Sequence, residues 1–295
     1  MRILITGATG LLGIALQESI QDNVELFGVY HPPRSLPLPL RAQIRPADVT
    51  DMTLMRAIFE WAKPYVVIHA AAIGSVDFAE QHREQTRAVN VGGTQVVAAL
   101  CREFNSKLVY ISSNAVFDGN TPFYSETDPV NPINYYGKLK VEAEETVKVS
   151  GASWAIIRPI LMYGWNYPGE RQTPVAWWLQ SLRERKPIKV VNNVFSKPLY
   201  VESCAQTVWA AVRLQRCGLF HIAGRDHISL YHFALKTAET FGLDSKLIEP
   251  VPDSYFPELA ARPRDTSFDT TKMESELGVA PMSVEEGLQR MKGCE

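Results

Sequence analysis

The sequence has few cysteines, no apolar run of about 18 residues and almost no excess of charge of either sign. Its four cysteines form no CxxC pair and show no metal-ligand spacing, which argues against a disulfide framework and favours a reducing compartment, the cytoplasm. The six histidines show no HxH or HxxxH spacing, so no metal site is predicted. A net charge of −2 argues against a nucleic-acid binder that works by bulk charge. No membrane-spanning helix is expected either.

What the chain does have is the composition of a globular protein long enough for about two domains. It contains 295 residues, of which 46% are hydrophobic and 21% charged, and domains average roughly 150 residues. Short apolar runs alternate with stretches of helical periodicity through the first half. The predicted strands are Arg2–Thr6, Glu25–Tyr30, Val66–Ala70, Leu108–Ser112 and Trp154–Arg158. The predicted helices are Leu12–Gln21, Asp51–Lys63, Glu84–Asn105 and Tyr136–Val149.

This alternation predicts an α/β fold in which buried parallel strands are joined by right-handed crossover helices, a doubly wound sheet of the Rossmann type. From about Tyr163 the rhythm changes, and prolines interrupt a series of short segments. We therefore expect a Rossmann body over residues 1–165 and a smaller C-terminal lobe over residues 166–295, with parts of the second half returning to the body. No clean linker separates the two.

A glycine motif follows the first predicted strand directly: Gly7-Ala8-Thr9-Gly10-Leu11-Leu12-Gly13. In a dinucleotide site Gly7 would permit the tight turn, Gly10 would let the backbone approach a pyrophosphate, and Gly13 would allow close packing of helix on strand. The helix N-terminus would add free N–H groups and a partial positive charge. A purely structural turn is the alternative. The strand before the motif and the amphipathic helix after it favour a dinucleotide site, which makes residues 1–165 the NAD(P)-binding part.

The end of the second predicted strand bears on the choice of cofactor. NAD sites usually place an acidic residue there for the ribose 2′-hydroxyl, but this strand ends in Tyr30-His31-Pro32-Pro33-Arg34. Arg34, with His31, would suit a 2′-phosphate, and a solvated loop arginine is the alternative. Asp48 could reach the adenine amino group, while Thr50 or Asp51 is a natural N-cap for the next helix. The sequence favours NADPH and leaves NADH open.

Tyr136 and Lys140 lie at positions i and i+4 of a predicted helix and therefore share one face. A tyrosine pKa of about 10 suits proton transfer near neutrality only when a cation lowers it, and Lys140 would be that cation. Long helices also contain such pairs by chance. Ser113 follows the strand Leu108–Ser112 at the expected carboxyl edge of the sheet, where ligands of such folds bind, and could hydrogen-bond a substrate carbonyl. Taken alone, it is equally a polar residue at a strand-to-loop junction.

Together these segments resemble the extended short-chain dehydrogenase/reductase superfamily over nearly the whole chain, from Gly7 to about Gly287. Further motifs resemble the dTDP-4-dehydrorhamnose reductase family within it. They are Val76-Asp77-x-Ala79-Glu80, Val116-Phe117-Asp118-Gly119, Glu126-x-Asp128-Pro129-x-Asn131-Pro132, Tyr136-Gly137-Lys138-x-Lys140-x-x-x-Glu144, Ala261-Arg262-Pro263, Ser267-Phe268-Asp269 and Lys272-Met273-Glu274. The resemblance implies NADPH-dependent reduction of the C4 ketone of a nucleotide-linked 6-deoxy-4-keto sugar, in the synthesis of precursors such as dTDP-L-rhamnose for cell-surface polysaccharide.

The resemblance also implies roles for four residues. Tyr136 would supply the proton, and Lys140 would keep Tyr136 acidic and orient the nicotinamide ribose. Ser113 would polarise the ketone that receives the 4-pro-S hydride of NADPH. Asn90 matches the asparagine that supports the lysine through a water in the wider superfamily. These four residues form the predicted catalytic set, and Asn90, Tyr136 and Lys140 also count among the expected cofactor contacts.

Substrate contacts are expected mainly from the second half. Arg262 matches the arginine that binds the diphosphate of the sugar nucleotide in related epimerases, and a surface salt bridge to Glu258 or Asp265 is the alternative. Tyr163 and Asn166 follow the strand Trp154–Arg158 and are expected to rim the cleft. The remaining cofactor contacts are expected from Thr9, Leu11, Leu12, Val49, Ala70, Ala71, Ala72 and Pro159.

Two departures from the family pattern keep other functions open. The chain has Ser112-Ser113-Asn114-Ala115 where the dehydrorhamnose reductases usually carry Ser-Thr-Asp-Tyr, and Asn90 lies in a sequence closer to sugar epimerases and dehydratases. An epimerase or dehydratase is therefore one alternative. The other is a binding protein similar to the regulatory β subunit of methionine adenosyltransferase, which resembles these reductases and binds NADP. The retained serine, tyrosine and lysine favour an enzyme. The expected partner of the protein is a small-molecule sugar nucleotide, and the sequence leaves a homodimer open.

Overall fold

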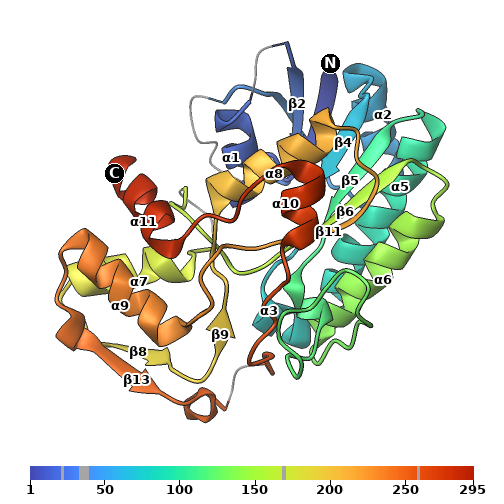
Figure 1. The fold of residues 1–295 in the computed structure, drawn as a ribbon. Coiled ribbons are helices and arrows are strands. Elements are labelled where there is room, and N and C mark those ends of the chain that lie inside the picture. The colour runs from blue at the N-terminus through green and yellow to red at the C-terminus, as the bar shows by residue number, and fades with distance from the viewer. Residues whose placement is uncertain (21–22, 33–39, 168–170, 258–259) are drawn as a thin grey trace.

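The computed structural model describes residues 1–295 except 21–22, 33–39, 168–170 and 258–259, and it has a parallel seven-stranded sheet at its centre (Figure 1). The strand order is β11-β6-β5-β4-β1-β2-β3. The strands are β1 (Arg2–Thr6), β2 (Glu25–Tyr30), β3 (Gln43–Pro46), β4 (Val66–His69), β5 (Lys107–Ile111), β6 (Trp154–Pro159) and β11 (Gly218–Ile222). The order reverses between β1 and β4, which is where ligands of doubly wound sheets bind. The predicted fold class is confirmed.

Helices cover both faces of this sheet, which is why its central strands are apolar throughout. Every residue of β4 and β5 is buried, as expected for parallel strands packed on two sides. One face packs against α2 (Met52–Ala62), α5 (Gly93–Glu103) and α6 (Tyr135–Val149). The other packs against α1 (Leu11–Glu18), α8 (Val201–Arg213) and α10 (Thr271–Leu277). Two of these helices and strand β11 come from the second half of the chain.

The rest of the second half forms a lobe beside the sheet (Figure 1). Its helices are α7 (Pro174–Arg183), α9 (Leu230–Phe241) and α11 (Val284–Gly293). Three pairs of short strands accompany them: β7 (Met162–Tyr163) with β10 (Leu199–Tyr200), β8 (Ile188–Val191) with β13 (Ile248–Val251), and β9 (Phe195–Ser196) with β12 (Ile228–Ser229). One continuous hydrophobic core runs from Ile3 and Ile5 of β1 to Leu288 and Met291 of α11. The division of the chain at residue 165 remains a prediction.

Several elements differ from those predicted. Strand β3 is an edge strand of mostly exposed residues, so it carries no apolar run that would predict it. The predicted helix Glu84–Asn105 consists of α4 (Arg83–Arg87), a π-helical turn η1 (Ala88–Gly92) and then α5. A short helix α3 (Val76–Gln81) precedes it and was not predicted. Within the described residues, no helix is both long and apolar enough to cross a membrane.

Candidate active site

The first turn of α6 is packed tightly against the chain that leaves β5. Asn134 caps the helix, and its side-chain oxygen accepts a hydrogen bond from the Gly137 N–H at 2.8 Å. A Cβ at Gly137 would lie only 2.1 Å from the Ala115 carbonyl oxygen. The missing side chain therefore lets α6 approach the 3₁₀ turn η2 (Asn114–Val116), for which Ser113 is the N-cap. This contact brings Tyr136 of α6 close to Ser113.

Tyr136 lies close enough to Ser113 for the serine hydroxyl to act on the pKa of the phenol. Tyr136 is only 9% exposed. Burial raises the pKa of Tyr136, while the nearby Ser113 hydroxyl and the charge of Arg171 act in the opposite direction. Burial outweighs both of these effects, so the lowering of this pKa that was predicted from Lys140 is not met. At neutral pH Tyr136 is a protonated phenol with a proton to donate.

Lys140 lies one turn further along the same face of α6. Its Nζ donates hydrogen bonds to the Ile111 carbonyl at 2.9 Å and to the Tyr110 hydroxyl at 3.3 Å, and it lies 5.8 Å from the centre of the Tyr136 ring. Burial lowers the pKa of Lys140 to about 8, and the charge of Glu144 opposes this shift. The lysine is thus anchored to the end of β5, which continues into Ser113.

Asn90 is buried in the π-helical turn η1. Its side-chain oxygen accepts a hydrogen bond from the Ile73 N–H at 2.8 Å, and its side-chain nitrogen donates to the Ile73 carbonyl at 3.1 Å. Both polar atoms of the side chain are therefore used to hold the loop that follows β4. Such π turns are frequent at functional sites. Its predicted support of Lys140 through a water stays a prediction.

The glycine motif between β1 and α1 has the geometry of a phosphate cradle. Gly7 has a φ of +72°, and a Cβ there would meet the backbone nitrogen of Ala71 at 2.9 Å. A Cβ at Gly13 would meet the Gly7 carbonyl oxygen at 2.2 Å, so this residue seats α1 against the turn. Gly10 is the N-cap of α1 and offers no side chain to cap it. The first N–H groups of the helix are thus left to a ligand, which fits the pyrophosphate of a dinucleotide.

The other expected cofactor contacts lie around this turn. Ala70, Ala71 and Ala72 follow β4 at the carboxyl edge of the sheet, and the first two lie beside Gly7. Thr9 and Leu12 are buried within the motif, Leu11 opens α1, Val49 is buried against Gly93, and Pro159 ends β6.

His31 and Asp48 are paired in the structure, although the sequence analysis considered them separately. The Nε2 of His31 lies 3.7 Å from Oδ2 of Asp48. Burial alone would raise the pKa of Asp48, but hydrogen bonds from Thr50 and the proximity of His31 bring it below its usual value. Asp51 caps α2, as one of the two predicted N-caps. Arg34 lies outside the described residues.

Two predicted substrate contacts serve the packing of the lobe. Tyr163 is 1% exposed and packs against the rings of Tyr200 and Phe233, so its predicted place on the rim of the cleft is wrong. Tyr163 belongs to the short strand β7, which follows β6 and pairs with β10, and this pairing buries its side chain. Asn166 closes its own loop: its side-chain oxygen accepts from the Thr173 N–H at 2.7 Å, and its nitrogen donates to the Arg171 carbonyl at 2.9 Å.

Arg262 is held beside α6 by Asp77 of α3. Its Nη2 lies 2.5 Å from Oδ2 of Asp77. Of the two predicted salt-bridge partners, Asp265 pairs with His227 instead, and Glu258 lies outside the described residues. The neighbouring Ala261 carbonyl accepts a hydrogen bond from the side chain of Asn134, two residues before Tyr136. Arg171, which the sequence analysis missed, donates to the Gly74 carbonyl at 2.9 Å. Its charge acts on both Asp77 and Tyr136, so two arginines lie at this side of the site.

The sequence model of the family described as the RmlD substrate binding domain matches residues 1–293. This chain belongs to that family. A dTDP-4-dehydrorhamnose reductase of Aggregatibacter actinomycetemcomitans is 29% identical over 304 residues, covering 99% of this chain and 98% of that protein. The methionine adenosyltransferase 2 subunit beta of Bos taurus is 30% identical over 285 residues, covering 94% of this chain and 83% of that protein.

A solved structure agrees with this membership of the RmlD family. The dTDP-4-dehydrorhamnose reductase of Bacillus anthracis, in complex with NADP, has a TM-score of 0.86 and 28% identity, covering 100% of this chain and 99% of the other. The predicted resemblance to these reductases, within the extended short-chain dehydrogenase/reductase superfamily, is confirmed. RmlD family membership alone does not choose between a reductase and a regulatory subunit, because both names occur among relatives of similar identity.

Proposed function

We propose that this protein is an NADPH-dependent reductase of the C4 ketone of a nucleotide-linked 6-deoxy-4-keto sugar, of the dTDP-4-dehydrorhamnose type. The observation that carries the proposal is the meeting of Ser113, Tyr136 and Lys140 at the carboxyl edge of the sheet. The glycine cradle beside it would hold the pyrophosphate of NADPH, which when bound supplies the hydride. A regulatory protein that only bound NADP would not need the serine, tyrosine and lysine together.

Each of these side chains has a defined task. Tyr136 donates its phenolic proton to the ketone oxygen, since burial keeps it protonated at neutral pH. Ser113, which lies near Tyr136, orients the same oxygen. Lys140, held by the Ile111 carbonyl, places a positive charge beneath the ring of Tyr136 and stabilises the phenolate that remains after proton transfer.

The diphosphate of the substrate needs positive charge in a chain whose net charge is −2. Arg262 and Arg171 are the cations on the side of the site nearest Asp77. We propose that Arg262 exchanges Asp77 for the diphosphate when the substrate binds, because guanidinium groups form strong charge-assisted hydrogen bonds with phosphate. The names of the reductase relatives support a sugar nucleotide as the substrate.

The compartment proposed for this reaction is the cytoplasm. Cys217 and Cys294 are exposed free thiols, and Cys101 and Cys204 are buried free thiols. Unpaired exposed thiols suit a reducing compartment. A homodimer stays a prediction.

The proposal is tested by Tyr136→Phe, which removes the proton donor and keeps the ring that packs beside Lys140. We expect kcat for NADPH oxidation with a 4-keto sugar nucleotide to fall by about 10² to 10⁴-fold, with the Kd for NADPH nearly unchanged. Absorbance of NADPH measures the rate, and a panel of 4-keto sugar nucleotides identifies the substrate. A variant that keeps more than about a tenth of the wild-type kcat would show that Tyr136 is not the acid.

The alternative function is that of a regulatory subunit, favoured by the 30% identity to the bovine methionine adenosyltransferase 2 subunit beta. Both functions predict binding of NADPH, so cofactor binding does not separate them. Turnover does: wild-type protein that binds NADPH but oxidises it with no member of the panel supports the regulatory alternative and contradicts the proposed reductase.

A further inference from the structure

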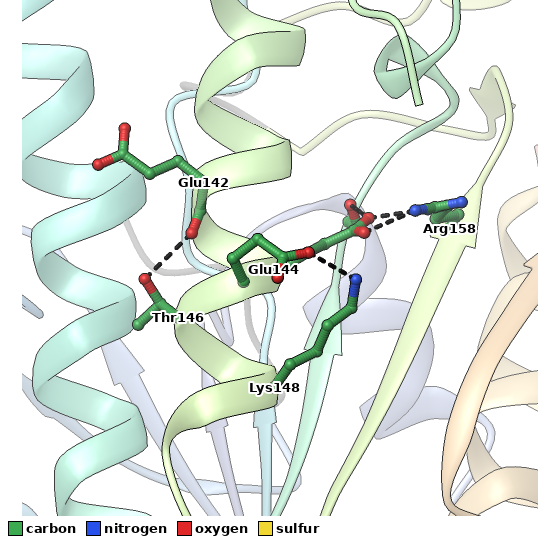
Figure 2. A network of polar contacts seen from close by, with 7 residues as sticks. Glu142, Glu144, Thr146, Lys148 and Arg158 are labelled. Atoms are coloured by element: carbon green, nitrogen blue, oxygen red, sulfur yellow. Dashed lines mark hydrogen bonds and ion pairs between the residues drawn. The ribbon is translucent and has the colours of Figure 1, made fainter. Parts of the chain in front are cut away.

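A buried ion pair lies one turn beyond Lys140, on the face of α6 that also carries Tyr136. The two nitrogens Nε and Nη2 of Arg158 donate to the carboxylate of Glu144 at 2.8 and 2.6 Å (Figure 2). The side chains are 3% and 1% exposed. The Ser112 hydroxyl donates to the same carboxylate at 2.5 Å. Glu144 thus joins its helix to β6 through Arg158 and to the end of β5 through Ser112.

The position of this pair relates it to the catalytic residues. Tyr136, Lys140 and Glu144 are spaced four residues apart, so they lie on one face of α6. Lys140 is fixed to the Ile111 carbonyl and Glu144 to the Ser112 hydroxyl, and Ser113 is the next residue. Two successive turns of the helix therefore hold two successive residues, Ile111 and Ser112, directly before Ser113.

His221 completes the network on the far side of Arg158. The Nη1 of Arg158 lies 3.2 Å from Nε2 of His221, and Nδ1 of His221 lies 3.0 Å from the Tyr124 carbonyl. Since Arg158 only donates, Nε2 accepts and the ring proton is on Nδ1, where it donates to Tyr124. Burial, followed by the charge of Arg158, lowers the pKa of His221 to about 3, so the ring is neutral. The network holds one negative and one positive charge.

The competing explanation is that the pair only joins α6 to β6 and has no part in catalysis. Buried ion pairs often contribute no more stability than hydrophobic residues of similar volume would, so burial alone does not explain why this pair is present. What distinguishes this pair is the third hydrogen bond, from Ser112, next to the catalytic serine. We propose that Glu144 is a positioning residue, which with Arg158 and Ser112 fixes the distance between the end of β5 and α6 so that Ser113 and Tyr136 reach one carbonyl oxygen together. This inference rests on the proposed reductase function.

Two variants test the role of Glu144, and a third is their control. Glu144→Gln removes the charge in an isosteric side chain, and Ser112→Ala removes the third hydrogen bond while leaving the ion pair intact. Glu142→Gln is the matched control, since Glu142 points away from this pair (Figure 2) and forms an exposed ion pair with Arg87. We expect kcat to fall by about tenfold or more in both test variants, because misplacement of about 1 Å can cost 10²-fold. The Kd for NADPH and the KM for the sugar nucleotide should stay within about twofold of the wild type, as should every constant of Glu142→Gln.

A purely structural role would not lower kcat alone. We therefore look in Ser112→Ala for a lower kcat while KM, the Kd for NADPH and the melting temperature stay unchanged. If Glu144→Gln does not fold, Ser112→Ala decides alone. A wild-type kcat in a folded Ser112→Ala overturns the inference, as does a parallel loss of NADPH binding. If the wild type itself has no reductase activity, the proposed function fails, and crystal structures of wild type and Ser112→Ala decide. An unchanged distance between the Ser113 and Tyr136 hydroxyl groups overturns the inference, and an increased distance supports it.

Discussion

Tyr136 and Lys140 stand one helical turn apart, yet burial acts on them in opposite ways. It raises the pKa of the tyrosine, whose charged form is the anion, and lowers that of the lysine, whose charged form is the cation. The raised pKa keeps a proton on Tyr136, and the lowered pKa makes the proton on Lys140 easier to lose. As pH rises, Lys140 therefore loses its proton before Tyr136 does, although the two residues belong to one sequence motif.

A loss of turnover above about pH 8 follows at the residue scale. The pKa of Lys140 is lowered to about 8, so as pH rises through this value the lysine loses the charge that stabilises the phenolate of Tyr136. We expect kcat to be constant below this pH and to fall above it, while Tyr136 stays protonated. Stopped-flow measurement of single turnovers between about pH 6 and pH 10 checks this. A rate that stays constant up to pH 10 would show that Lys140 keeps its proton or is not needed.

At the scale of elements, the site depends on how closely α6 approaches η2. Asn134 and Ser113 cap the two elements, and the absent side chain of Gly137 lets them touch. The sequence reveals the i, i+4 pair on α6 because helical spacing is local. It does not reveal this contact, which joins residues more than twenty positions apart in the sequence.

The change Gly137→Ala tests that contact. Alanine favours helix over glycine by about 1 kcal/mol, but its Cβ would lie 2.1 Å from the Ala115 carbonyl oxygen. Overpacking of this kind typically costs about 1–3 kcal/mol. We expect lower stability in urea and a lower kcat, because α6 must move away from Ser113. Gly293→Ala in α11 is the control, since a Cβ there meets nothing within 4 Å. Equal stability of the two variants would contradict the close approach.

The elements also show what could be predicted from the sequence. Strands β1 and β2 have the predicted bounds because buried parallel strands are continuous apolar runs. The same criterion misses β3, which is largely exposed, and β11, which lies in the second half. The i, i+4 pair of Tyr136 and Lys140 and the glycine motif can be recognised in the sequence because each depends on local spacing. Arg171 and the partners of Glu144 cannot be recognised, since their contacts are set by tertiary packing.

The placement of Tyr163 was wrong for the same reason. A tyrosine after the last predicted strand was expected at the cleft, whereas β7 pairs with β10 and turns it into the core. A strand of two residues such as β7 is too short to give a recognisable pattern in the sequence.

At the scale of the whole molecule, the two halves of the chain share their core. Strand β11 pairs with β6 at one edge of the sheet, and α8 packs against α1 below the glycine motif. The Trp209 indole of α8 donates a hydrogen bond to the Leu16 carbonyl of α1 at 3.1 Å. The helix that presents the cofactor cradle is therefore packed against a helix from the second half. A dinucleotide site formed in this way should not survive unfolding of the second half.

Leu288→Ala tests this dependence from the end of the chain furthest from the cradle. Leu288 of α11 is fully buried in the core that also contains Ile3 and Ile5, and removal of a buried leucine side chain to alanine costs about 2–5 kcal/mol. We expect the urea midpoint to fall equally when it is followed by tryptophan fluorescence and by loss of NADPH binding, because the two halves unfold as one unit. Leu214→Ala is the control: Leu214 is 45% exposed, and its truncation should change the midpoint little. NADPH binding that persists beyond the fluorescence transition would show that residues 1–165 fold without the second half.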